Sequence, residues 1–189
     1  MSTQQLAAPQ AVRAFVALPV GERIRACVAE TIESLRGGVV GIGWVSDAGV
    51  HLTLRFLGWA SPDRLASLAE PLGRAAAACP ASEAGFAGLG TFPERGSPRV
   101  LWLGVRLRPE LEALQAACEA AARAAGFAPE TRPFRAHVTL GRFRERARRP
   151  RLPEIDLGVA LLDRLILFRS DLRPSGAVYT PLASFALGG

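Results

Sequence analysis

Apolar and polar residues recur along the chain with two periods, one typical of strands and one typical of helices. Short apolar or alternating runs predict strands at 12–18, 43–46, 50–57, 85–92, 99–107, 134–143, 161–168 and 177–185. Apolar positions three or four residues apart predict three helices. The first opens at 19–22 and stops at Gly37 and Gly38, and the others span 61–79 and 109–125. This order predicts an α+β chain of two interlocked sheet-and-helix halves.

Two of the predicted strands carry the same motif. The chain has only two histidines, and they lie in Val50-His51-Leu52-Thr53-Leu54 and Ala136-His137-Val138-Thr139-Leu140. Successive side chains of a strand point to opposite faces, so each His shares a face with the Thr two positions later. Given ordinary Ser and Thr frequencies, the chance that both histidines have a Ser or Thr two positions later is roughly one or two in a hundred. The duplication therefore favours a shared function over two accidental, half-buried histidines.

Two facing histidines suit the opening of a cyclic phosphodiester, because that reaction needs a base and an acid on opposite sides of one phosphate. An imidazole pKa of about 6.5 allows one ring to be neutral while the other is protonated. Thr53 and Thr139 could bond a phosphate oxygen or orient their histidines. The scheme needs no metal, and the spacing of His51 and His137 matches no metal motif. We therefore expect neither a metal nor a cofactor.

Composition indicates a soluble globular protein. The chain has 189 residues, is 49% hydrophobic and carries a net charge of +6, and all of its basic residues are arginines. Arginine suits phosphate recognition, although a GC-rich genome would also enrich it. Three widely spaced cysteines argue against a disulfide framework. The polar segment 1–10 lacks the charged start and apolar run that are typical of a signal peptide, and no stretch of about 18 apolar residues is present. We expect residues 1–189 to form a single domain and the protein to be a cytoplasmic monomer.

Further residues could contact a nucleotide substrate. Arg135 and Arg142 flank the second motif and could bind phosphate. Phe92, Tyr179 and Trp44 could stack a terminal base, although packing in the core is the favoured role of Trp44 and of Trp102. The arginines of the loop 145–153 and the one just before it could guide RNA or could simply form a solvated loop: Arg144, Arg146, Arg148, Arg149 and Arg151.

The paired motifs resemble those of the two-histidine (2H) phosphoesterase superfamily, specifically its LigT-like RNA 2′,3′-cyclic phosphodiesterases, also called the 2′-5′ RNA ligase family. The likeness covers nearly the whole chain and includes segments 13–18, 43–45, 54–58, 89–93, 99–104, 132–137 and 167–170. Two departures are Ala136, where proline is common in the family, and Arg55, where lysine is common. Neither changes a motif His or Thr.

This resemblance implies a two-lobed fold with pseudo-two-fold symmetry around a central cleft. It also implies hydrolysis of a 2′,3′-cyclic phosphate at an RNA end to a 2′-phosphate. His51 would give a proton to the leaving 3′-oxygen and His137 would activate water. The residues alone do not assign these two roles, because the motifs are nearly interchangeable.

Two other functions stay open. The chain could act on another phosphoester, such as a 2′-5′ linked oligonucleotide or a small cyclic nucleotide, or could join RNA ends. It could also be a nucleotide-binding module without turnover. The intact His and Thr of both motifs argue against this second alternative.

Overall fold

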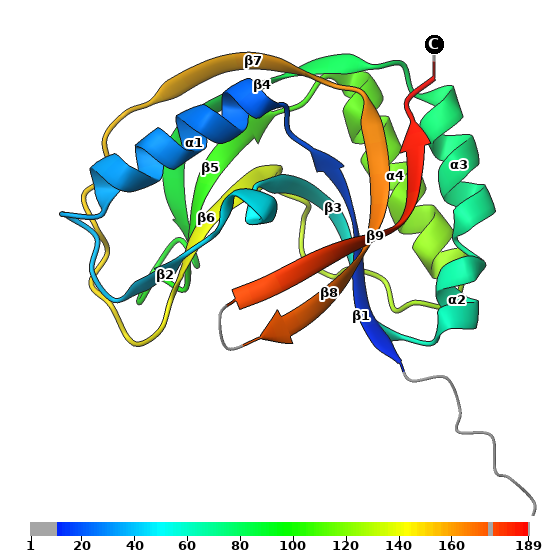
Figure 1. The fold of residues 1–189 in the computed structure, drawn as a ribbon, viewed down its shortest axis with the longest axis horizontal. Coiled ribbons are helices and arrows are strands. Elements are labelled where there is room, and N and C mark those ends of the chain that lie inside the picture. The colour runs from blue at the N-terminus through cyan, green and yellow to red at the C-terminus, as the bar shows by residue number, and fades with distance from the viewer. Residues whose placement is uncertain (1–10, 174–175, 189) are drawn as a thin grey trace, which may run out of the picture.

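The strands form one strongly curled sheet (Figure 1). The structure, a computed structural model, describes residues 11–173 and 176–188, so the polar segment 1–10 lies outside the described residues. Within these ranges nine antiparallel strands pair in the order β7-β4-β5-β6-β3-β1-β8-β9, and β2 pairs with β6. The strands are β1 (Val12–Pro19), β2 (Ile42–Trp44), β3 (His51–Ala60), β4 (Ser82–Phe92), β5 (Val100–Arg106), β6 (His137–Phe143), β7 (Asp156–Leu162), β8 (Arg164–Arg173) and β9 (Gly176–Ala186).

The sheet consists of two halves that meet between β3 and β6. Among the described residues, Leu52 of β3 and Val138 of β6 are the one pair of residues that joins the two strands at this junction. Helix α1 (Glu22–Leu35) lies over the half that contains β4, β5 and β6 (Figure 1). Helices α3 (Ala69–Ala78) and α4 (Pro109–Ala124) pack against β9 and β3 of the other half. The α+β prediction is therefore confirmed.

The predicted helix 61–79 is in fact two helices, α2 (Pro62–Ala66) and α3. Its predicted start is confirmed, because the Ser61 side chain accepts a hydrogen bond from the backbone N–H of Arg64 and Pro62 occupies the first turn. Pro71, in the first turn of α3, has no N–H to give to the carbonyl of Ser67, which favours the interruption between α2 and α3 at Ser67 and Leu68. The break places Leu68, which is 1% exposed, in the core.

Two strand predictions were wrong. The predicted strand 161–168 is divided between β7 and β8, and most of β7 was missed. Strand β7 is an edge strand that pairs only with β4 among the described residues, and its Val159 and Leu161 are more than half exposed. Its apolar residues therefore do not show the pattern of a buried strand. The predicted strand 134–143 begins only at His137, because the preceding segment reaches β5 through one bond, from the N–H of Val105 to the carbonyl of Ala136.

The remaining elements match their predictions to within a few residues. No helix in the described part of the chain is long and apolar enough to cross a membrane.

Candidate active site

The two His-x-Thr motifs lie side by side on β3 and β6. Since Leu52 is opposite Val138 in an antiparallel pair, His51 neighbours Thr139 and Thr53 neighbours His137. Leu52 and Val138 are completely buried. All four motif side chains are partly exposed on the other face. Each histidine therefore stands next to the threonine of the opposite motif, an arrangement that places two imidazoles and two hydroxyls around one small space.

Aromatic rings hold His51. Its imidazole stacks on Phe15 of β1 with 4.8 Å between ring centroids, and Tyr179 of β9 meets it edge-on at 5.2 Å. Phe168 of β8 is the cross-strand partner of Phe15 and stacks on it at 5.2 Å. Sequence reasoning selected Tyr179 but missed both phenylalanines, because a phenylalanine in an apolar strand looks like any core residue. Only the pairing of β1 with β3 and β8 brings these rings to the histidine.

His137 is held by the chain just before it. Its Nδ1 lies 2.7 Å from the carbonyl oxygen of Arg135. A carbonyl can only accept, so Nδ1 donates and Nε2 keeps its lone pair in the neutral ring. Phe92, at the end of β4, meets the imidazole edge-on at 5.0 Å and also contacts Trp102 of β5. The geometry therefore leaves Nε2 as the nitrogen of His137 that can take a proton.

Both imidazoles are easier to deprotonate than free histidine. Burial is the main cause that lowers the pKa of His51 to about 4, and the charges of His137 and Arg142 lower it further. Burial also lowers the pKa of His137, against a smaller opposite effect of its hydrogen bond to the Arg135 carbonyl. A bound phosphate would add a negative charge beside both rings and would favour protonation of either one.

The two arginines selected from the sequence both reach the site. A register shift between β5 and β6 gives β6 one extra residue around Leu140, which returns the Arg142 side chain to the histidine face. Its charge accordingly lowers the pKa of both histidines. Arg135 forms an ion pair with Glu94 and lies over the ring of Phe92, 5.6 Å from its centroid. Sequence reasoning did not select Glu94.

A cavity of about 350 Å³ opens beside His137. Its walls combine aromatic rings and guanidinium groups with the backbone of β4 and β5: Ala87, Phe92, Trp102, Gly104, Val105, Arg106, Phe134, Arg135 and Ala136. Trp102 was expected in the core, but it lies on this wall because it alternates with the buried Leu101 and Leu103. The size is at the lower end of the range for small-molecule sites.

Two other residues selected from the sequence, Trp44 and Arg149, have structural contacts. Trp44 of β2 lies near Arg36, whose guanidinium carbon is 5.9 Å from the ring centroid, and does not line the cavity. Arg149 donates to the Thr91 hydroxyl and to the carbonyl of Pro93 at 2.9 Å, so this arginine of the 145–153 loop fastens the loop to the β4–β5 turn. The exposed side chains of Arg144, Arg146, Arg148 and Arg151 remain candidates for RNA contacts.

Arg55 follows the first motif but belongs to the core side of β3. It is 7% exposed, forms an ion pair with Glu119 of α4 at 2.5 Å, and donates to the carbonyl of Ala128. A basic residue at this position therefore joins β3 to α4 and does not face the histidines.

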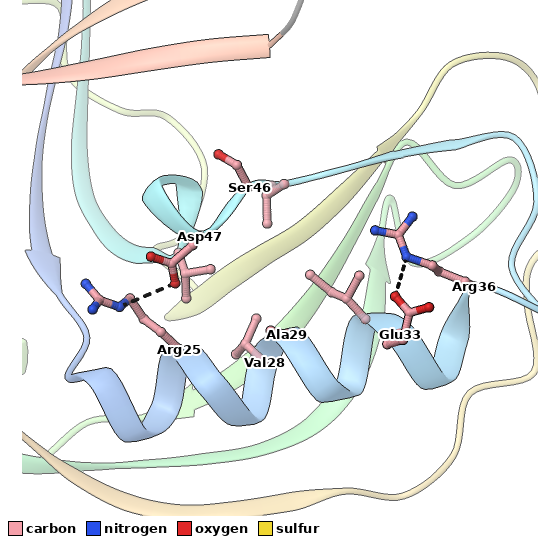
Figure 2. Close-up of a pocket in the computed structure, with 10 residues that line it drawn as sticks. Arg25, Val28, Ala29, Glu33, Arg36, Ser46 and Asp47 are labelled. Carbon is pink, nitrogen blue, oxygen red and sulfur yellow. Dashed lines mark hydrogen bonds and ion pairs between the residues drawn. The ribbon is translucent and has the colours of Figure 1, made fainter.

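A second cavity, of about 180 Å³, lies between α1 and the segment that leads into β3 (Figure 2). Arg25 and Asp47 form an ion pair across it, with 3.4 Å between Nε and Oδ1. Val28, Ala29 and Ile32 form its apolar wall, and neither histidine lines it. Among the described residues, no group of three or more His, Cys, Asp or Glu is arranged to hold a metal ion.

The chain is similar in sequence and fold to known proteins. Residues 25–169 match the model of the 2′-5′ RNA ligase superfamily. An RNA 2′,3′-cyclic phosphodiesterase from Thermotoga maritima is 32% identical over 90% of this chain and 93% of its own length. One from Thermus thermophilus is 35% identical over 94% of this chain and 91% of its own.

Solved structures also resemble this chain in fold. A crystal structure of a protein from Thermus thermophilus superposes with a TM-score of 0.83 at 31% identity, covering 94% of this chain and 98% of that one. The ligand-free structure of Escherichia coli LigT superposes with a TM-score of 0.78 at 25% identity, covering 95% of this chain and 99% of that one. The family match spans both histidine motifs, and the two relatives extend over nearly the whole chain. This chain therefore belongs to the 2′-5′ RNA ligase superfamily.

Proposed function

We propose that this protein is an enzyme that hydrolyses the 2′,3′-cyclic phosphate at an RNA end to a 2′-phosphate, without a metal or another cofactor. The observation that carries the proposal is the pairing of β3 with β6, which sets His51 and His137 on one face, each beside the threonine of the other motif. Relatives named RNA 2′,3′-cyclic phosphodiesterase, about 30% identical over most of the chain, support the choice of substrate.

In this mechanism the two imidazoles exchange protons with opposite sides of the phosphate. Nε2 of His137 takes a proton from water as the water oxygen bonds to phosphorus. The bond from phosphorus to the 3′-oxygen breaks, and His51 gives that oxygen its proton. The 2′-oxygen keeps the phosphate. Thr53, Thr139 and Arg142 would hold the non-bridging oxygens, on which negative charge grows in the transition state.

The substrate charge would prepare His51 for its role. In the free protein, burial together with the electrostatic effects of His137 and Arg142 lowers the pKa of His51 to about 4, so its ring is neutral at pH 7. A bound phosphodiester carries one negative charge between the imidazoles, and an opposite charge at this distance raises a histidine pKa. The proton that His51 donates is therefore taken up as the substrate binds.

The cavity beside His137 would receive a nucleoside of the RNA end. Phe92 and Trp102 offer aromatic surfaces, and Arg106 and Arg135 offer charges for a neighbouring phosphate. Tyr179 packs against His51 and is proposed to limit the opposite side of the site. We also infer that residues 1–189 act as a single two-lobed domain, as a cytoplasmic monomer. A hydrophobic cluster shared by both halves of the sheet supports the single domain.

The test uses EDTA-treated protein and a short RNA that ends in a 2′,3′-cyclic phosphate. We expect metal-independent formation of a 2′-phosphate, and losses of about a hundredfold or more in His51→Ala and His137→Ala. A 3′-phosphate product would contradict the assigned direction of bond cleavage. Equal turnover by wild type and His51→Ala would contradict the mechanism. RNA binding without turnover would identify a binding module instead.

A further inference from the structure

The residue that orients His137 lies in a segment without regular structure. Arg135, whose carbonyl accepts the Nδ1–H of His137 at 2.7 Å, precedes β6 and belongs to neither a strand nor a helix. Its neighbour Ala136 has one backbone bond to β5, from the N–H of Val105 at 3.1 Å. Position and tautomer of the imidazole therefore depend on how firmly this short segment is held.

The Arg135 side chain supplies a second anchor for that segment. Its guanidinium forms an ion pair with the carboxylate of Glu94 and covers the ring of Phe92, whose edge meets His137. Glu94 follows Phe92 by two residues, so these contacts close a ring: Glu94 to Arg135, Arg135 to His137, His137 to Phe92, and back along the chain. Moving Arg135 would shift the carbonyl that holds His137 and would remove the guanidinium from the ring of Phe92.

The turn that carries Glu94 is itself fixed. Arg149 donates to the carbonyls of Pro93 at 2.9 Å and Gly96 at 3.4 Å, one on each side of Glu94 and Arg95. The Ser97 hydroxyl, in the same turn, exchanges hydrogen bonds with the backbone of Ala147. Glu94 therefore extends from a turn that is held by hydrogen bonds, and it contacts the segment before β6, which has few other hydrogen bonds. The side-chain hydrogen bond and the charge of Arg135 lower the pKa of Glu94, so Glu94 is ionised at neutral pH.

We propose that Glu94 is a positioning residue for His137: through Arg135 it holds the carbonyl that keeps the imidazole proton on Nδ1 and leaves Nε2 free. The kinetic consequence rests on the proposed function, whereas the effect on the tautomer does not. The ion pair is exposed, with 54% of Arg135 and 61% of Glu94 accessible. Exposed pairs add little to stability, so Glu94→Gln should fold normally.

Nitrogen NMR of ¹⁵N-histidine-labelled protein tests this directly, because the chain has only two histidines. Spectra at about pH 8 report tautomers, since both rings are neutral well above the free imidazole pKa. A His51→Asn variant assigns the signals. We expect the Nδ1–H form of His137 to dominate in wild type. In Glu94→Gln its ratio to the Nε2–H form should fall about two- to fivefold, the range that the free energy of an exposed pair allows.

The matched control is Glu83→Gln. Glu83 lies at the other end of β4 and forms a comparably exposed pair with Arg108, at 3.6 Å, away from both histidines. This variant should leave the His137 signals unchanged. Arg135→Gln should reproduce the effect of Glu94→Gln, and the double variant should add nothing, because both changes break one linkage.

An unchanged tautomer ratio in Glu94→Gln overturns the proposal, and so does a wild-type His137 with its proton on Nε2. Fully additive effects in the double variant would show that Glu94 does not act through Arg135. If the RNA substrate is turned over, kcat of Glu94→Gln should fall by less than the two- to fivefold change in the tautomer ratio, because kcat follows the fraction of His137 in the Nδ1–H form. A tautomer shift in a protein without turnover would overturn the proposed function and leave the role of Glu94 standing.

Discussion

At the scale of single residues, the site depends on two imidazoles whose charges are coupled. Burial lowers the pKa of both histidines, and for His51 the charge of His137 is the second cause. The reaction needs one ring protonated and the other neutral, so the pH dependence belongs to the pair and not to either ring alone. The charge of Arg142 lowers the pKa of both histidines, and the charge of a bound phosphate opposes this effect.

The pH optimum of kcat/KM should therefore lie below that of kcat. The profile of kcat/KM reports the free protein, where both pKa values are lowered, with His51 at about 4. The profile of kcat reports the bound complex, where the phosphate anion raises both values. As the pH rises, the histidine that acts as the acid therefore loses its proton at a lower pH in the kcat/KM profile than in the kcat profile.

Initial rates of cyclic-phosphate hydrolysis between pH 4 and 9 (roughly two units either side of the free imidazole value) measure both profiles. Two bell-shaped curves with separated optima are expected. Coincident optima would show that the phosphate does not shift the pKa values of these imidazoles. A flat rate across this range would contradict acid-base catalysis by the two histidines.

At the scale of elements, the strand that carries His51 is tied to α4 by a buried ion pair. Arg55 of β3 is 7% exposed and Glu119 of α4 is 22% exposed, and their side chains approach to 2.5 Å. Glu119→Gln leaves a guanidinium without its counter-charge in a largely buried position. We expect it to lower the free energy of unfolding by about 3 kcal/mol, the lower end for breaking a buried pair because Glu119 is partly exposed.

Urea unfolding of Glu119→Gln beside the exposed-pair variant Glu33→Gln measures this cost. Glu33 pairs with Arg36 on the surface of α1 and should contribute less than about 1 kcal/mol. Equal midpoints for the two variants would show that Arg55 needs no partner.

The elements show what a sequence can predict. The alternation of His51, Leu52 and Thr53 is a local property of a strand, and the structure confirms it, as it does the helices that begin at Pro62 and Pro109. The edge strand β7 was missed because its apolar residues are exposed, and Trp102 was misplaced because both faces of β5 carry apolar residues.

Contacts between distant segments lay beyond any local pattern. Glu94 is separated from Arg135 by 41 positions, and Arg149 from Thr91 by 58. A charged residue in a loop has the same local signature whether it braces a turn, as Arg149 does, or faces solvent. Phe15 was likewise indistinguishable from a core residue, which it also is, at 3% exposure.

At the scale of the whole molecule, the net charge of +6 should make RNA binding depend on salt. The exposed arginines of the 145–153 loop, Arg146, Arg148 and Arg151, follow the strand that carries His137. Each phosphate of a single strand that a protein neutralises changes the slope of log affinity against log salt by about 0.7. Replacing all three arginines by glutamine should therefore reduce the slope by about 2 if each contacts one phosphate.

Binding of a cyclic-phosphate RNA to the slow His51→Ala protein, measured across a salt series, gives this slope without turnover. The control removes the same charge elsewhere, with Arg74→Gln, Arg123→Gln and Arg164→Gln on the far helices and at the start of β8. If only total charge matters, the two triple variants will lose affinity alike with the slope hardly changed. A loss of slope confined to the loop variant would instead locate the path of the RNA backbone along the loop that leaves β6. Arg149 is left intact in both, because its bonds to the β4–β5 turn would otherwise mix a structural effect with an electrostatic one.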